Sequence, residues 1–121
     1  MSLLVLDRSA IVAFAAGSVH VGEPIAEVHS EGGQIVVPVV CLIEAASEVG
    51  DEMPRVLLRH PACTVPPVTV EMWPALAAGT RRLGRLDLAA ALYLATTGEG
   101  YVLTAEPDAY GDLGEDTVIP I

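Results

Sequence analysis

Four carboxylic acids stand where an apolar segment ends or a helix is expected to begin. Asp7 directly follows the apolar run LLVL, and Glu106 lies two residues after Thr104, which ends YVLT. Glu44 lies in the segment VCLIEAASEVGDE, and Asp87 is near the start of the Ala- and Leu-rich segment LDLAAALYLATTGEG. Carboxylate oxygens are preferred ligands of Mg²⁺ and Mn²⁺, and such a cation activates water for hydrolysis. These four acids are therefore candidate metal ligands and candidate catalytic residues.

Short apolar strands alternate with helices among the elements expected to position these acids. Runs of Val, Ile and Leu predict strands at residues 3–6, 34–39, 62–68, 101–104 and 117–121. Helices are expected at residues 9–17, 23–33, 40–52, 53–60, 70–84 and 86–100, with a helical turn at 108–114. This order predicts a single domain over residues 1–121, with a three-layer α/β/α fold around a central, mostly parallel sheet.

The expected topology brings the four acids to one edge of the sheet. In parallel sheets, functional groups collect beyond the carboxyl ends of the strands, where Asp7 and Glu106 are expected to lie. The helix that Asp87 opens must run antiparallel to the next strand, which returns Asp87 to the same edge. Glu44 falls in the first turns of a helix that starts from that edge. Carboxylates gathered in a partly dry pocket repel one another, and a divalent cation is the usual counter-charge.

Each acid also has a simpler interpretation, which the local sequence leaves open. Asp7 could cap the first helix, and Asp87 could cap the helix that it opens. Glu44 belongs to a set of polar residues at helical spacing and could lie on a solvated helix face. Glu106 and Asp108 could begin a turn before a short helix, where acids suit the helix dipole. The common edge, rather than any one residue, is what favours a functional site.

The composition restricts the classes of function. Sixteen Asp and Glu residues stand against six arginines, lysine is absent from the sequence, and the formal net charge is −10. This charge opposes non-specific binding to nucleic acid, and it suits a divalent cation or a basic partner. A P-loop is excluded because it requires a lysine on the phosphates.

The sequence also predicts a cytoplasmic protein that does not cross a membrane. The longest apolar run, residues 35–43, is too short and is interrupted by Pro38. The first ten residues lack the basic start of a signal peptide. Cys41 and Cys63 show no metal-type spacing and are expected to be free thiols, as in a reducing compartment.

Over essentially its whole length, the chain resembles a PIN domain, the ribonuclease fold of the toxin in many bacterial toxin–antitoxin pairs. The resemblance rests on LLVLDRSAIVAF, VVPVVCLIEAASEV and GRLDLAAALYLATTGEGYVLTAEPDAY, in that order. It implies an endoribonuclease whose acids hold one or two Mg²⁺ or Mn²⁺ ions. Asp7, Glu44 and Asp87 match acidic positions of the family, and Ser9 and Thr104 match its small hydroxyl positions.

The chain departs from the family pattern at the fourth acidic position. This position, two residues after Thr104, usually holds Asp, and here it holds Glu106. The additional methylene moves the carboxylate by about one carbon–carbon bond, and Mg²⁺ demands near-octahedral geometry. Glu106 could bind through water, or Asp108 could take over its role.

Three hypotheses arise for the function. The first is a metal-dependent endoribonuclease, the toxin of a toxin–antitoxin pair, in which Arg81, Arg82 and Arg85 guide the RNA backbone; these arginines could instead form a solvent-facing helix end. The second is a catalytically weakened PIN-like domain that acts as a protein- or RNA-binding module. The third is an unrelated α/β binding domain whose acids cap helices. The resemblance also implies a homodimer and a cognate antitoxin protein as partners.

Overall fold

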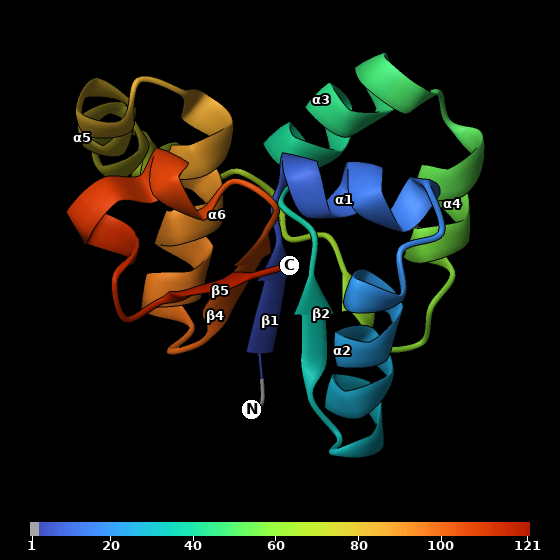
Figure 1. The fold of residues 1–121 in the computed structure, drawn as a ribbon. Coiled ribbons are helices and arrows are strands. Elements are labelled where there is room, and N and C mark those ends of the chain that lie inside the picture. The colour runs from blue at the N-terminus through green and yellow to red at the C-terminus, as the bar shows by residue number, and fades with distance from the viewer. Residues whose placement is uncertain (1–2) are drawn as a thin grey trace.

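The computed structural model describes residues 3–121 as a sheet flanked by helices (Figure 1). The strands are β1 Leu3–Leu6, β2 Gln34–Val36, β3 Cys63–Thr64, β4 Tyr101–Thr104 and β5 Val118–Pro120. The α-helices are α1 Arg8–Ala15, α2 Val19–Ser30, α3 Val39–Val49, α4 Glu52–Leu58, α5 Trp73–Leu83 and α6 Leu86–Thr97. Two 3₁₀ segments, η1 Val70–Met72 and η2 Pro107–Gly114, complete the order of elements.

The strands of this described region form a five-stranded sheet in the order β3-β2-β1-β4-β5, and each pairing is parallel. Helices α1 to α4 lie to one side of the sheet, and α5, α6 and η2 lie to the other (Figure 1). This arrangement confirms the predicted three-layer α/β fold. The sheet is wholly parallel, where the sequence predicted a mostly parallel one.

The neighbouring strands β1 and β4 form the centre of the core. Leu4, Val5 and Leu6 of β1 are fully buried, as is Val102 of β4. A parallel strand covered by helices on both faces needs apolar side chains at successive positions, which explains the run LLVL. The residues directly after these two strands therefore follow backbone that is buried in the core.

The first helix begins one residue earlier than predicted. Its N-cap is Asp7, whose side chain accepts a hydrogen bond from the backbone N–H of Ala10. The carboxylate offers the capping acceptor directly after β1, so α1 starts at Arg8. The capping interpretation of Asp7 is thus confirmed.

The next two helices also differ from their predicted bounds. α2 begins at Val19 because Ser18 caps it, accepting a hydrogen bond from the backbone N–H of His20. Pro24 therefore lies beyond the first turn of the helix, where its ring nitrogen cannot donate a hydrogen bond to the carbonyl of His20. α3 ends at Val49, where Gly50 takes a φ of 86°, and α4 begins separately after it.

A tight turn between α5 and α6 sets the place of Arg85. Gly84 ends α5 with a φ of 81°, a left-handed conformation that glycine adopts without steric cost. Arg85 is then the N-cap residue of α6, and Asp87 lies in its first turn. The prediction that Asp87 could be the N-cap was wrong by two residues, although its charge still suits the helix dipole.

Within residues 3–121, no single helix combines the length and apolarity needed to cross a membrane. Helices α1 and α2 meet that test only when taken together, and a bend of 105° separates them.

Candidate functional site

The carboxyl ends of β1 and β4 lie side by side at the point where the strand order changes direction. Such a point is where open α/β sheets place their functional groups. Asp7 directly follows β1, and Glu106 lies two residues after β4. Asp87 and Glu44 come from α6 and α3. We call these four residues the acidic edge: Asp7, Glu44, Asp87 and Glu106.

Asp7 is fully buried and is held by neutral donors. Its Oδ1 atom accepts hydrogen bonds from the Ser9 hydroxyl at 2.7 Å and from the Ala10 backbone N–H at 3.0 Å. Its Oδ2 atom accepts a hydrogen bond from the Tyr110 hydroxyl at 2.8 Å. A buried carboxylate requires partners of this kind, so Asp7 fastens β1 and α1 to η2.

The two predicted hydroxyl residues connect the start of α1 to the end of β4. The Ser9 and Thr104 hydroxyl oxygens lie 3.1 Å apart. Ser9 accepts a hydrogen bond from the backbone N–H of Ala105 at 2.8 Å, and Thr104 accepts one from the backbone N–H of Glu106 at 2.9 Å. Both hydroxyls therefore fix the backbone that carries Glu106.

The guanidinium group of Arg85 forms a fork, in which it donates hydrogen bonds to both Asp87 and Glu106. Its Nε and Nη2 atoms donate to the two carboxylate oxygens of Asp87 at 3.1 and 2.7 Å. Its Nη1 and Nη2 atoms donate to the two carboxylate oxygens of Glu106 at 3.3 and 3.1 Å. These hydrogen bonds, to Asp87 first and then to Glu106, raise the pKa of Arg85 above its ordinary value. The guanidinium thus remains charged and ties α6 to the segment after β4.

Arg8 links Glu44 to Asp87 through longer contacts. Its Nε atom lies 4.0 Å from Asp87 Oδ2, and its Nη1 atom lies 3.8 Å from Glu44 Oε2. The Asp87 side chain is almost completely buried, while those of Arg8 and Glu44 are partly exposed. Three carboxylates of the acidic edge therefore share two guanidinium groups, and Asp7 stands apart from these ion pairs.

Two neutral groups, the Cys41 thiol and the Tyr110 hydroxyl, have pKa values that are raised by both Asp7 and Asp87. The Cys41 thiol donates to the backbone oxygen of Asp87 at 3.3 Å. Burial, then the charges of Asp7 and Asp87, raises the pKa of the Cys41 thiol. Burial, then the charge and hydrogen bond of Asp7, raises the pKa of Tyr110, and Asp87 adds to this effect. Both carboxylates thus favour the protonated forms of Cys41 and Tyr110.

The donor chemistry of the acidic edge fits a hard divalent cation, because carboxylate oxygens are the ligands that Mg²⁺ and Mn²⁺ prefer. Within the part of the chain that the structure describes, however, no group of three or more Asp, Glu, His or Cys side chains is arranged to hold a metal ion. Arg85 instead lies between Asp87 and Glu106. A cation could use both carboxylates only if the Arg85 side chain moved aside.

The other predicted site residues divide between the edge and the surface. Asp108 is exposed in the first turn of η2, and among residues 3–121 it forms no ion pair. Arg81 and Arg82 are exposed in the last turn of α5. Arg85 was grouped with them as an RNA contact, but its guanidinium faces the acids. The two exposed arginines are therefore the ones left free to contact a phosphate backbone.

Two residues of the site were missed at the sequence level. Arg8 occupies the position between Asp7 and Ser9, and a charged residue directly after a site acid was the available signal. Tyr110 was given no role, although its ring is fully buried and its hydroxyl binds Asp7. Few aromatic residues are present in the chain, so a buried tyrosine near Glu106 was a weak signal at most.

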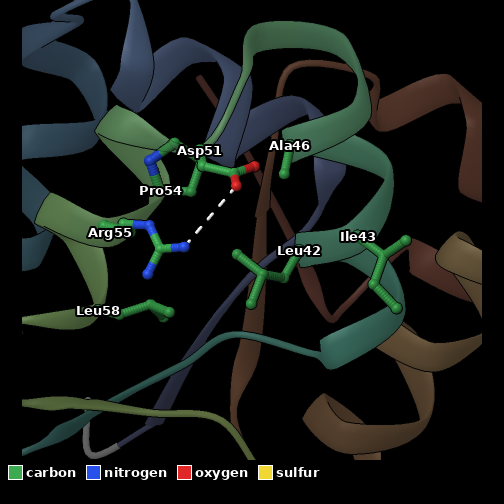
Figure 2. Close-up of a pocket in the computed structure, with 7 residues that line it drawn as sticks. All are labelled: Leu42, Ile43, Ala46, Asp51, Pro54, Arg55 and Leu58. Carbon is green, nitrogen blue, oxygen red and sulfur yellow. Dashed lines mark ion pairs between the residues drawn. The ribbon is translucent and has the colours of Figure 1, made fainter.

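A separate apolar hollow of about 250 Å³ lies between α3 and α4 (Figure 2). Leu42, Ile43, Pro54 and Leu58 contribute to its lining, and the side chains of Asp51 and Arg55 approach to 3.8 Å on its α4 side. This ion pair is largely exposed, so it contributes little energy. Apart from this pair, the side chains that line the hollow are apolar.

Neither a protein-family model nor a curated protein matches this sequence. Membership of the PIN family therefore stays a prediction, based on the residue motifs of the acidic edge.

Proposed function

We propose that this chain is a PIN-like, metal-dependent endoribonuclease that acts at its acidic edge. One observation carries the proposal: Glu44, Asp87 and Glu106 share the guanidinium groups of Arg8 and Arg85, and Asp7 and Glu106 follow the neighbouring strands β1 and β4. Metal-assisted hydrolysis of a phosphodiester needs oxygen ligands in such a position.

The residues at the acidic edge have different roles in the proposed reaction. Asp87, Glu106 and Glu44 would hold the cation, and the fixed carboxylate of Asp7 would complete its surroundings. A bound Mg²⁺ or Mn²⁺ lowers the pKa of a coordinated water and offsets charge on the phosphoryl oxygens. Ser9 and Thr104 hold the backbone of residues 105 and 106 and so orient Glu106.

The proposed substrate is RNA, held from the side of α5. Arg81 and Arg82 are exposed there and offer charge to a phosphate backbone. The chain as a whole is strongly acidic, with a net charge of −10, and would repel RNA elsewhere on its surface. Contact is therefore expected to be local rather than spread over the surface.

The biological role that accompanies this activity is that of a toxin acting in the cytoplasm. Its partners would be a second copy of the chain and a cognate antitoxin protein. The acidic surface suits a basic segment of such an antitoxin, because complementary charge speeds association and rejects wrong partners.

The direct test is cleavage of an RNA panel in Mn²⁺ by the unmodified protein and by Asp87→Asn. We expect the substitution to reduce the rate at least about a hundredfold, since it removes a carboxylate from the proposed metal site. Glu27→Gln is the matched control, because Glu27 is an exposed acid of α2, which carries none of the four acids. Equal cleavage by all three proteins, or no cleavage by the unmodified protein with any RNA, contradicts the proposal.

A second candidate is a PIN-like domain that binds RNA or protein without cleaving. The fork of Arg85 favours it, because a guanidinium already neutralises two acids of the edge. Calorimetric titration separates the two candidates. Absence of Mn²⁺ binding at millimolar metal, together with retained binding of RNA or of a partner protein, would support the binding module.

A further inference from the structure

We propose that Arg85 is a built-in competitor of the divalent cation: its guanidinium and the metal bind the same carboxylates, and one exchanges for the other. This inference rests on the metal site of the proposed function. It concerns which cation neutralises the acids of that site before the metal and the substrate bind.

The hydrogen bonds of Arg85 make simultaneous occupancy unfavourable. All four carboxylate oxygens of Asp87 and Glu106 accept a hydrogen bond from this side chain. A divalent cation coordinated by the same oxygens would stand next to a charged guanidinium, and like charges at such separations repel strongly. The two cations therefore exclude each other.

The burial of Asp87 turns this exclusion into an exchange. Its side chain is only 3% exposed, so loss of Arg85 would leave a nearly buried charge with Arg8 at 4.0 Å as its closest cation. A buried carboxylate without a close partner is costly. Departure of Arg85 is hence favoured only when another cation replaces it.

The position of Arg85 allows it to leave without unfolding a helix. Its backbone is extended, with φ −144° and ψ 133°, and lies outside the helical part of α6. Its side chain is 34% exposed, and that of Glu106 is 35% exposed, so solvent reaches the fork. The long side chain can turn outward about its own bonds while Asp87 stays in the first turn of α6.

The competition reduces the apparent metal affinity to its intrinsic value multiplied by the fraction of molecules whose Arg85 has left the two carboxylates. Isothermal titration calorimetry with MnCl₂ measures this directly on the unmodified protein, Arg85→Gln and Arg82→Gln. Arg82 is the matched control, because it is an exposed arginine of α5 and its replacement makes the same change in net charge. We expect Arg85→Gln to bind Mn²⁺ roughly tenfold more tightly than the unmodified protein, and Arg82→Gln to stay within about twofold of it.

A second variant guards against a folding defect in Arg85→Gln. Arg85→Lys keeps the charge but cannot fork, because lysine offers one ammonium in place of a planar pair of donors. Its Mn²⁺ affinity is expected to lie between those of the unmodified protein and Arg85→Gln. Urea unfolding without metal verifies that each variant is folded.

The outcomes for this inference and for the proposed function are distinguishable. Tighter Mn²⁺ binding by Arg85→Gln with no RNA cleavage by any variant supports the competition and contradicts the nuclease. Cleavage by the unmodified protein with unchanged Mn²⁺ affinity in Arg85→Gln supports the nuclease and overturns the competition. Equal tightening in Arg82→Gln, or no Mn²⁺ binding by any of the proteins, also overturns it.

Discussion

Asp7 and Asp87 are both buried acids near the carboxyl ends of β1 and β4, yet opposite kinds of partner hold them. Asp7 accepts hydrogen bonds from Ser9, from the Ala10 backbone and from Tyr110, all of them neutral. Asp87 is bound by the charged fork of Arg85. The partners of Asp7 lie on rigid elements, whereas the guanidinium of Arg85 lies at the surface on a long side chain.

This difference distinguishes Asp7, an acid with a structural role, from Asp87, an acid whose cationic partner can be exchanged. Neutral donors inside the core leave Asp7 no alternative partner, so its loss would disturb the fold. An arginine near solvent gains less net energy, because water competes for both charges and salt screens them. We infer that Asp7 positions the edge, while Asp87 and Glu106 are the acids that can change partners.

The largest expected effect is that of Asp7→Ala on stability. The substitution removes the cap of α1 and leaves the Tyr110 hydroxyl without its buried acceptor. We expect a loss of about 3 kcal/mol in the free energy of unfolding, measured by urea denaturation at neutral pH.

Asp7→Asn provides the control, because the amide keeps one acceptor for the Ala10 backbone N–H. It should lose roughly half as much as Asp7→Ala, since asparagine is a good helix cap. A change below about 0.5 kcal/mol for Asp7→Ala would mean that the buried acid does not hold the fold.

Tyr110→Phe tests the hydrogen bond between Tyr110 and Asp7 through the pH dependence of stability. We expect a loss of about 1.5 kcal/mol at neutral pH, because the phenyl ring packs as before but Asp7 Oδ2 loses its donor. Burial first, and then Asp7, raises the pKa of Tyr110 above its ordinary value of 10.0. Below that pH, the Tyr110 hydroxyl keeps its proton in both the folded and the unfolded chain, so its hydrogen bond contributes fully to stability. Above it, only the unfolded chain releases the proton, so stability falls as the pH rises.

The measurement is the urea midpoint of both proteins at neutral pH and at several values above about pH 10, the ordinary tyrosine pKa. Tyr110→Phe lacks this alkaline loss, so the stability gap between the two proteins should narrow with rising pH. The Cys41 thiol also has a raised pKa, but both proteins share it, and the comparison cancels its effect. A gap that widens in alkali would contradict the assignment.

The sequence predicted the edge itself because two strong rules act at β1 and β4. A continuous apolar run marks a strand buried on both faces, and parallel strands deliver their next residues to a common edge. Asp7 and Glu106 come after such strands, so their placement needed no knowledge of side-chain packing. The helix that returns to β4 brought Asp87 to the same place by connectivity alone.

The partners of the acids could not be predicted in this way. Arg85 appeared as the last of three neighbouring arginines, and its direction depends on the left-handed turn at Gly84. Its second acceptor, Glu106, lies 21 residues further along the chain, and the Tyr110 hydroxyl reaches back 103 residues to Asp7. Propensity and periodicity describe the backbone of a segment, but they do not specify which distant side chain a polar group meets.

The smallest effect is expected for Glu44→Gln, at the outer end of the arginine network. Glu44 approaches Arg8 only to 3.8 Å, and its side chain is 46% exposed, so the pair is worth about 0.5 kcal/mol or less. Glu27→Gln removes an exposed acid of α2, and it controls for the change in net charge. Urea unfolding of both variants at low and high salt is the measurement. A loss comparable to that of Tyr110→Phe would show that Glu44 belongs with Asp7 among the structural acids, because an exposed and screened pair cannot supply that much energy.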